Sequence, residues 1–374
     1  MKILAIDIGT GTQDILLFDS QKTIENSIKM VMPAPTVIAS QRIRKATESQ
    51  MPLAITGVNM GGGPVTQALH RHVKAKLPVY ATISAATTFD DDMDIVKDMG
   101  VTLVDDVDIF SMKSVTNVDL RDLDLKMIRD GMSTFGVDTD WDAIAVAVFD
   151  HGNAPPGYSD RKFRFDHLRS QVTHGKRNLR SFCYLPEEIP DYMTRMLSVV
   201  KVTESDTPIL LMDTAEAAVL GALEDRFVAA HENKLVANLG NEHTLAFYLR
   251  GEMIHGIFEH HTHILNKPRL ESFLEDLVTG DIDNDKVWKD RGHGSIVIGK
   301  GQKLEFLSVT GPMRQMLEGS RLQPYFATPH GDMMLAGSFG LIRAWAEKNE
   351  DWQEEIMHSL RNPATMTSTD SHPH

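Results

Sequence analysis

The chain has 374 residues, a formal net charge of −14 at pH 7 and 42% apolar residues. Its length fits two domains, because a single hydrophobic core rarely organises so many residues. The acidic balance argues against nucleic-acid binding, which needs clustered positive charge. No apolar run is long enough to cross a bilayer, and a strand is predicted from the first residues, so we expect a cytoplasmic protein without a membrane partner.

Residues 3–18 predict a strand, a tight glycine turn and a returning strand. The amides of a turn with two glycines, together with threonine hydroxyls, suit a phosphate chain. Carboxylates beside the turn could hold a divalent cation, directly or through water. The alternative is an ordinary β-hairpin. The candidate residues for nucleotide and cation are Asp7, Gly9, Thr10, Gly11, Thr12, Gln13 and Asp14.

Residues 52–63 predict a strand that runs into a glycine-rich turn, Gly61–Gly63, and a helix is predicted over residues 64–75. The amides at the start of that helix would attract an anion, although a flexible turn is the simpler interpretation. A further strand is predicted over residues 79–84. The alternation of strands and helices indicates the α/β class.

A buried strand is predicted over residues 141–149, and Asp150 and His151 follow it beside a loop rich in glycine and proline. Ligands of α/β proteins bind at the carboxyl ends of such strands. Either side chain could act as a general base toward a hydroxyl group or water. Alternatively, Asp150 caps the turn and His151 is merely exposed.

Residues 159–180 are basic within an otherwise acidic chain. Clustered arginines favour anions through bidentate contacts, so Arg161, Arg164 and Arg169 could hold a phosphorylated or carboxylated substrate. A solvated helix face, or a contact with another subunit, explains the same pattern.

The pattern of the first hairpin returns over residues 234–249. An apolar run again meets a polar residue, a glycine, a hydroxyl group and a second apolar run. The candidate nucleotide-binding residues of this copy are Asn238, Gly240, Asn241 and Thr244.

Histidines gather over residues 255–263, where a strand is predicted from 253 to 264. Because side chains alternate along a strand, Glu259, His261 and His263 would share one face, and His260 would lie on the other. Glutamate and histidine are ligands of zinc and iron, so these three residues are a candidate transition-metal site. Surface or hydrogen-bonded histidines are the alternative.

A strand over residues 304–312 carries Thr310 and Gly311, and a helix over 333–348 begins with small residues that include Gly337. The order of elements after each hairpin also repeats. We match residues 52–63 with 304–312, and residues 79–84 with 324–329. The repeat predicts two copies of one β-β-β-α-β-α unit.

These motifs, together with the small-residue helix at Asp213–Ala222, resemble those of the actin-like ATPase superfamily, which includes sugar kinases, Hsp70 and actin. The resemblance implies an α/β fold of two duplicated actin-like (ribonuclease H-like) domains, with ATP and Mg²⁺ in the cleft between them. It implies that Asp7 positions the metal, that the two hairpins hold phosphates, and that Gly311 and Gly337 admit the adenosine. The family usually has an acid where this chain has Asn238, so metal binding should be weaker.

The chain is also similar to a prokaryotic family labelled as a pyruvate formate-lyase activating enzyme. Activating enzymes of that kind hold an iron–sulfur cluster with three cysteines. This chain has one cysteine, Cys183, which we expect to be buried. It is therefore not expected to be a radical iron–sulfur activating enzyme.

We expect an N-terminal actin-like domain over residues 1–225 with an insertion around 85–205, a C-terminal domain over 226–360 and a disordered tail over 361–374. The leading hypothesis is an ATP-dependent phosphotransferase for a small, anionic substrate, or an ATPase. Two alternatives stay open, namely a low-turnover nucleotide-binding regulator and a metal-dependent transferase that uses the 255–263 histidines. The sequence does not give the oligomeric state.

Overall fold

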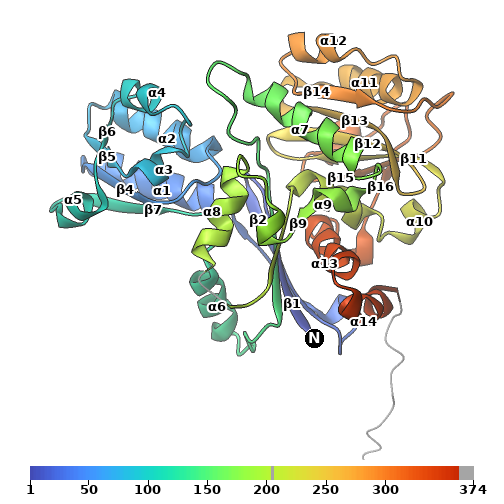
Figure 1. Cartoon of the computed structure of the whole chain (residues 1–374), viewed down its shortest axis with the longest axis horizontal. Coiled ribbons are helices and arrows are strands. Elements are labelled where there is room, and N and C mark those ends of the chain that lie inside the picture. The colour runs from blue at the N-terminus through green and yellow to red at the C-terminus, as the bar shows by residue number, and fades with distance from the viewer. Residues whose placement is uncertain (204–205, 362–374) are drawn as a thin grey trace, which may run out of the picture.

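The computed structural model describes residues 1–203 and 206–361, which form an α/β protein built on three sheets (Figure 1). Two of these sheets have six strands each, and the third has four. The α/β class expected from the alternating strands and helices is confirmed. Among the described residues, no helix is both long and apolar enough to cross a membrane.

The first large sheet has the strand order β3-β2-β1-β8-β10-β9. Strands β1 to β3 form an antiparallel meander, and β8 and β10 continue from β1 in parallel. The centre of the sheet is buried on both faces, which suits the near-continuous apolar sequence of β1 and β8. The bounds are β1 (Lys2–Ile8), β2 (Thr12–Asp19), β3 (Ile28–Pro33), β8 (Ala143–Val148), β9 (Cys183–Tyr184) and β10 (Ile209–Met212).

The second large sheet has the strand order β14-β13-β12-β11-β15-β16. Strands β11 to β13 again form an antiparallel meander, and β15 and β16 continue from β11 in parallel. The bounds are β11 (Asn233–Leu239), β12 (His243–Arg250), β13 (Met253–His261), β14 (Gly294–Val297), β15 (Leu307–Thr310) and β16 (Tyr325–Phe326).

The two large sheets are copies of one design. Each contains a three-stranded meander followed by two parallel strands on the other side of the first strand. The sixth strand differs, because β9 lies beside β10 in the first sheet and β14 lies beside β13 in the second. Even the hairpin turns match, because the N–H of Gly9 donates to the carbonyl of Thr12, and that of Gly240 donates to the carbonyl of His243, both at 2.9 Å. The chain therefore contains two copies of one α/β domain, as the repeat predicted, together with an inserted unit.

The assignment of the later strands to the repeat is corrected by the sheet order. The fourth and fifth strands of the two copies are β8 and β10 in the first and β15 and β16 in the second. Residues 52–63 and 79–84 therefore do not match residues 304–312 and 324–329. They contain β4 and β5, which belong to the third sheet. A parallel strand followed by a helix has the same local pattern in either place.

The third sheet belongs to an inserted unit with its own hydrophobic core, seen apart from both domains on the left of Figure 1. It is wholly parallel, in the order β6-β5-β4-β7. The insertion expected around residues 85–205 lies elsewhere in the structure. Residues 35–120 build the separate unit, whereas β8 and β9 belong to the first large sheet. Its elements are α1 (Pro35–Glu48), β4 (Leu53–Gly57), α2 (Gly63–Lys74), β5 (Val79–Ala81), α3 (Ile83–Ala86), α4 (Met93–Asp98), β6 (Val101–Leu103), α5 (Asp106–Ser111) and β7 (Thr116–Leu120).

Two helices, α9 (Thr214–Ala222) and α13 (Ala336–Lys348), cross at the centre of the molecule and join the domains (Figure 1). Each follows the last parallel strand of its copy of the repeat. Their backbones touch where both helices lack a side chain. A Cβ on Gly221 would lie 1.6 Å from the carbonyl oxygen of Ala336, and one on Gly340 would lie 1.9 Å from that of Ala217. The small residues of the predicted crossing helix are thus required by this contact.

Of the remaining helices, α7 (Asp160–His174) contacts β14, and α11 (Lys267–Thr279) contacts β12 and β13 of the second large sheet. Cys183 is buried, as expected. The predicted tail over 361–374 lies outside the described residues apart from Arg361, which ends α14. The helices are α6 (Leu125–Thr134), α7 (Asp160–His174), α8 (Thr194–Val202), α10 (Arg226–Ala229), α11 (Lys267–Thr279), α12 (Asn284–Lys289) and α14 (Glu350–Arg361).

Candidate functional site

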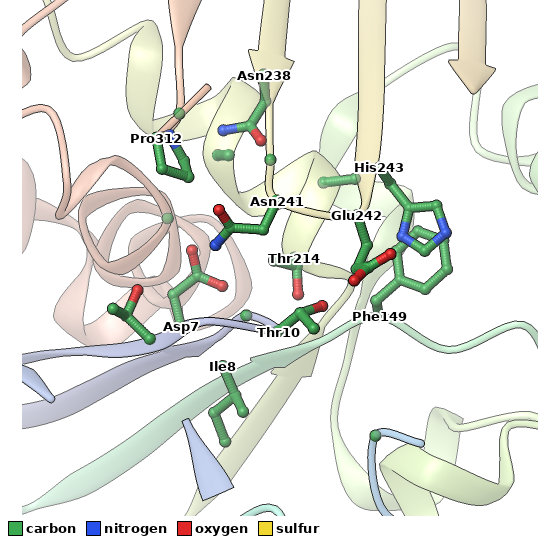
Figure 2. Close-up of a pocket in the computed structure, with 18 of the residues that line it drawn as sticks. Asp7, Ile8, Thr10, Phe149, Thr214, Asn238, Asn241, Glu242, His243 and Pro312 are labelled. Carbon is green, nitrogen blue, oxygen red and sulfur yellow. The ribbon is translucent and has the colours of Figure 1, made fainter. Parts of the chain in front are cut away.

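A cavity of about 410 Å³ lies between the two domains, where the two matching hairpin turns face each other (Figure 2). Its volume is in the range of small-molecule sites. The first domain contributes the turn after β1 and the start of α9, and the second contributes the turn after β11 and the start of α13. The glycines before α2 close the side toward the inserted unit. The cleft therefore draws on all three parts of the molecule.

Two buried carboxylates lie at the first hairpin. Asp7 and Asp14 are partners across the β1–β2 pair, and each is 8% exposed. One oxygen of each, Oδ1, has no hydrogen-bond partner among the described residues. Burial, together with the charges of Asp14 and Asp213, raises the pKa of Asp7 well above its usual value. Burial is also the main cause that raises the pKa of Asp14, to about 7. A bound cation would relieve this repulsion and desolvation.

The start of α13 lies against the Asp7 carboxylate. A Cβ on Gly337 would lie 1.9 Å from Oδ2 of Asp7, so only glycine leaves room for this side chain. Gly311 and Met333 line the same end of the cleft, where the Gly311 N–H donates to Sδ of Met333 at 3.2 Å.

The second hairpin presents amides where the first presents a carboxylate. Asn238 occupies the position of Asp7 in the repeat, and its Nδ2 donates to Oγ1 of Thr310 at 3.2 Å. Asn241 extends from the turn across the cleft toward Asp7 (Figure 2), and its amide nitrogen lies close to Gly11 of the opposite turn. The two turns therefore contact each other across the cleft.

Most of the predicted nucleotide-binding residues line this cleft, and four do not. Gly11 contacts Asn241 but is not part of the wall. The other three are held by neighbours behind the wall: Gln13 donates to the Pro33 carbonyl, Thr244 bonds to Thr262, and Thr310 bonds to Asn238. The residues in the wall are Gly9, Thr10, Thr12, Asn238, Gly240, Asn241, Gly311 and Gly337.

Asp150 and His151 have different surroundings. The Asp150 carboxylate accepts from three backbone N–H groups, those of Gly152, Arg195 and Met196, at 2.9 to 3.0 Å. Burial raises its pKa, against these hydrogen bonds. Oδ1 is occupied in the loop by Gly152, and Oδ2 is occupied at the start of α8, which fits the capping role weighed for Asp150. His151 instead lines the cleft, and burial lowers its pKa to about 3.

Arg164 is buried in an ion-pair network and is not available to a substrate. Its guanidinium donates to both carboxylate oxygens of Asp213 and to both of Glu259, at 2.7 to 3.2 Å. Arg161 donates to the Gly292 carbonyl, and Arg169 is exposed on the same helix, α7. The expectation that these arginines hold an anion is not supported by their positions, because none of them lines the cleft.

Histidines gather at the end of the cleft beside the second hairpin. His261 and His263 line the cleft, but Glu259, the third member of the predicted metal site, lies behind it, bonded to Arg164 and to Nδ1 of His293. The residues that converge with His151 are His243 and His293, with ligand nitrogens all within 4.8 Å of one another. Neither His243 nor His293 was named as a site residue from the sequence. These three histidines come from distant segments, and no local pattern joins them.

A second, polar groove of about 790 Å³ adjoins the cleft. The two share Gly61–Gly63, Phe149, His151 and Arg195 in their walls. The far wall of the groove is acidic, because Asp90–Asp92 and Asp160 line it. Burial is the main cause that raises the pKa of Asp91, to about 6, followed by the charges of Asp160 and Asp90.

The sequence profile of a known family covers most of this chain. The family is described as "Putative pyruvate format-lyase activating enzyme (DUF1786)", and its profile matches residues 60–316. The chain belongs to this family. Its one cysteine, Cys183, is buried, so it lacks the three thiolates that hold the cluster of iron–sulfur activating enzymes. No curated protein matches the sequence.

Solved structures resemble the chain only weakly. The activator of the 2-hydroxyisocaproyl-CoA dehydratase from Clostridium difficile, with bound ADPNP, is 9% identical, with 95% of this chain and 98% of that chain covered and a TM-score of 0.37. The apo ParM protein of psk41 is 12% identical, with 95% and 99% covered and a TM-score of 0.33. The ROK hexokinase from Thermus thermophilus is 12% identical, with 93% and 100% covered and a TM-score of 0.30.

Proposed function

We propose that this member of the family binds ATP with Mg²⁺ in the cleft and transfers the terminal phosphoryl group to a small acceptor in the adjoining groove. One observation carries the proposal: two matching glycine turns face each other around a single cavity that contains unpartnered carboxylate oxygens of Asp7 and Asp14. Phosphoryl transfer needs mainly positioning and neutralisation of charge. Paired turns and a cation site supply both.

The residues present fit Mg²⁺, which prefers oxygen ligands and keeps several of its waters. Asp7 and Asp14 would hold the ion or its water shell through the oxygens that have no protein partner among the described residues. Thr10 and Asn241 would contact the phosphates from the two turns. Thr214 adds a third unpartnered polar atom, Oγ1, at the start of α9. Bound Mg²⁺ would neutralise charge on the phosphates.

The adjoining groove favours a transferase over a simple ATPase, because it offers space for a second substrate beside the phosphates. Its acidic wall suits a polyhydroxylated or cationic acceptor better than an anion. His151 lies in the walls of both cavities, between the proposed positions of the phosphates and of the acceptor.

A nucleotide-binding regulator is the second candidate, and Asn238 favours it. In the second hairpin an amide, bonded to Thr310, replaces the carboxylate that the first hairpin offers at Asp7. A site with one acidic hairpin would bind the nucleotide but turn it over slowly. This candidate predicts tight ATP binding without a phosphorylated product.

Calorimetric titration with ATP, with and without Mg²⁺, tests the proposal. We expect Mg²⁺-dependent binding that Asp7→Asn weakens at least about tenfold, the effect of losing 1.4 kcal/mol of binding free energy. The control is Asp130→Asn, because Asp130 is exposed on α6, away from the cleft. Binding with release of ADP upon addition of pooled sugars, polyols and amines supports the transferase. Binding without product supports the regulator, and no binding by the wild type overturns both.

A further inference from the structure

Three histidines from separate segments converge at one end of the cleft. His151 follows β8, His243 begins β12, and His293 precedes β14. One ring nitrogen from each lies within 4.8 Å of the other two. His261 adds a fourth ring, whose centroid is 4.7 Å from that of His293 and 5.2 Å from that of His243. Around a tetrahedral zinc ion, ligand nitrogens lie about 3.3 Å apart, given Zn–N distances of about 2.0 Å. Small side-chain rotations would bring the three ring nitrogens to this spacing.

The most buried of these rings is held in the orientation that a ligand needs. Nδ1 of His293 donates to Glu259, and the Glu259 carboxylate is fixed by Arg164. Nε2 of His293 is buried and has no partner among the described residues. In metalloproteins a carboxylate commonly holds the far nitrogen of a histidine ligand and so fixes its tautomer. The Glu259–His293 pair has this arrangement.

The imidazole rings of the cluster are crowded together. The ring centroid of His243 lies 4.8 Å from that of His293 and 6.1 Å from that of His151. Neutral imidazole is the form that binds a metal ion. Lone pairs that point together without a proton between them repel one another, and a cation removes this repulsion.

We propose that His151, His243 and His293 bind one divalent transition-metal ion of the zinc class, with Glu259 as the carboxylate that orients His293. Three imidazoles leave a fourth position open, which is the composition of a catalytic zinc site. His151, His243 and His261 line the cleft, so the open position faces the cavity. This site differs from the predicted set of Glu259, His261 and His263, because Glu259 is already paired with Arg164.

The site stands apart from the proposed Mg²⁺ site at Asp7 and Asp14, since it lies beside the second hairpin and uses nitrogen ligands. Bound there, the ion would act as a Lewis acid toward an oxygen atom of a ligand in the cleft. The inference does not require ATP binding, and it can be tested without any nucleotide.

Titration of chelator-treated protein with Zn²⁺, followed by a competing indicator, measures the site directly. Co²⁺ provides a second probe through its visible absorption. We expect the protein to bind one equivalent of Zn²⁺ tightly. His151→Ala, His243→Ala and His293→Ala should each lower the affinity for this ion at least about a hundredfold. Glu259→Gln should weaken it about tenfold to a hundredfold, as expected for a carboxylate that orients a ligand. His70→Ala is the control, because His70 is exposed on α2, and Asp7→Asn should keep the site intact.

Protection from histidine modification provides a measurement on the wild type, independent of whether the variants fold. Bound Zn²⁺ should protect His151 and His243, which line the cleft, from diethyl pyrocarbonate while His70 continues to react. The proposal is overturned if the protein binds no Zn²⁺ tightly. It is also overturned if Zn²⁺ binds tightly but the histidine variants bind it equally well and the bound ion does not protect the histidines. Loss of ATP binding with retention of the Zn²⁺ site would contradict the proposed function alone.

Discussion

Gly337 shows how one missing side chain positions a functional group. A Cβ at this position would overlap Oδ2 of Asp7, and Asp7 has little room to retreat because it is 8% exposed within β1. We therefore predict that Gly337→Ala displaces the carboxylate and weakens Mg²⁺-dependent ATP binding at least about tenfold. Calorimetric titration checks this effect, and circular dichroism shows whether the fold is kept.

Gly131→Ala is the matched control for that substitution. Gly131 also lies in a helix, α6, but a Cβ there would have as its nearest neighbour the flexible end of Met30, 3.8 Å away. Alanine at this position should leave ATP binding unchanged and stabilise the helix by about 0.5–1 kcal/mol. Equal binding by the two variants would show that Gly337 does not set the position of Asp7.

The pKa of Asp14 predicts how pH acts on the protein without metal. Burial raises this pKa to about 7. Between pH 4 and 7 the folded state therefore keeps a proton that the unfolded state releases, and the free energy of unfolding falls as pH rises through this window. The histidines of the cleft act in the opposite direction, because their pKa values are lowered. The contribution of Asp14 to the pH dependence of the free energy of unfolding must therefore be measured as a difference between the wild type and an Asp14 variant.

Thermal melts of the wild type and of Asp14→Asn between pH 5 and pH 8, in the presence of a chelator, isolate that contribution. We expect the variant to gain stability relative to the wild type as pH rises. Added Mg²⁺ should shrink the difference above pH 7, because the ion binds the ionised carboxylate. Parallel curves for the two proteins would show that Asp14 does not titrate in this range.

At the scale of elements, the Arg164 network ties helix α7 to strand β13 of the second domain. Removal of a buried cation leaves two buried carboxylates, Asp213 and Glu259, without their partner. We predict that Arg164→Met lowers the free energy of unfolding by about 3–5 kcal/mol in urea titration. Arg161→Met on the same helix should cost about 1 kcal/mol, because Arg161 is half-buried and stacks on Trp288. Similar losses of unfolding free energy in the two variants would show that the Arg164 ion pairs do not stabilise the fold more than an ordinary surface contact does.

The elements also show what sequence patterns can and cannot predict. The two hairpins were predictable, because an apolar run, a glycine turn and a second apolar run are local features that recur in both halves. The roles of residues 52–63 and 79–84 were not, because sheet membership depends on long-range pairing. The third sheet uses the same strand-and-helix pattern as the repeat, so the insertion was placed too late in the chain.

The residues of the cleft likewise include some that the sequence could predict and some that it could not. Residues of the turns, such as Thr10 and Asn241, could be named because their sequence positions fix their place at the strand ends. The bonds that occupy Asp150 and Glu259 come from segments far along the chain, and only the folded structure reveals them. The same is true of His293, whose orientation depends on a partner in another strand.

At the scale of the molecule, the two domains share one hydrophobic core through α9 and α13, and the first residues of both helices also line the cleft. A ligand that bridges both hairpins should therefore stabilise the domains together. At a ligand concentration about 100 times the dissociation constant, the gain is about 2.7 kcal/mol. Such a ligand restrains both turns, although they lie far apart in the sequence.

Hydrogen exchange checks this coupling. We predict that ATP with Mg²⁺ slows the exchange of backbone amides at residues 8–12 and at residues 239–243 together, since phosphates held between the turns order both. Strand β6, at the edge of the inserted unit, should show no change, because it lies far from the cavity wall. Asp7→Asn should remove the protection at both turns. Protection confined to one hairpin would mean that the nucleotide binds a single domain, and the matching turns would then have lost their common role.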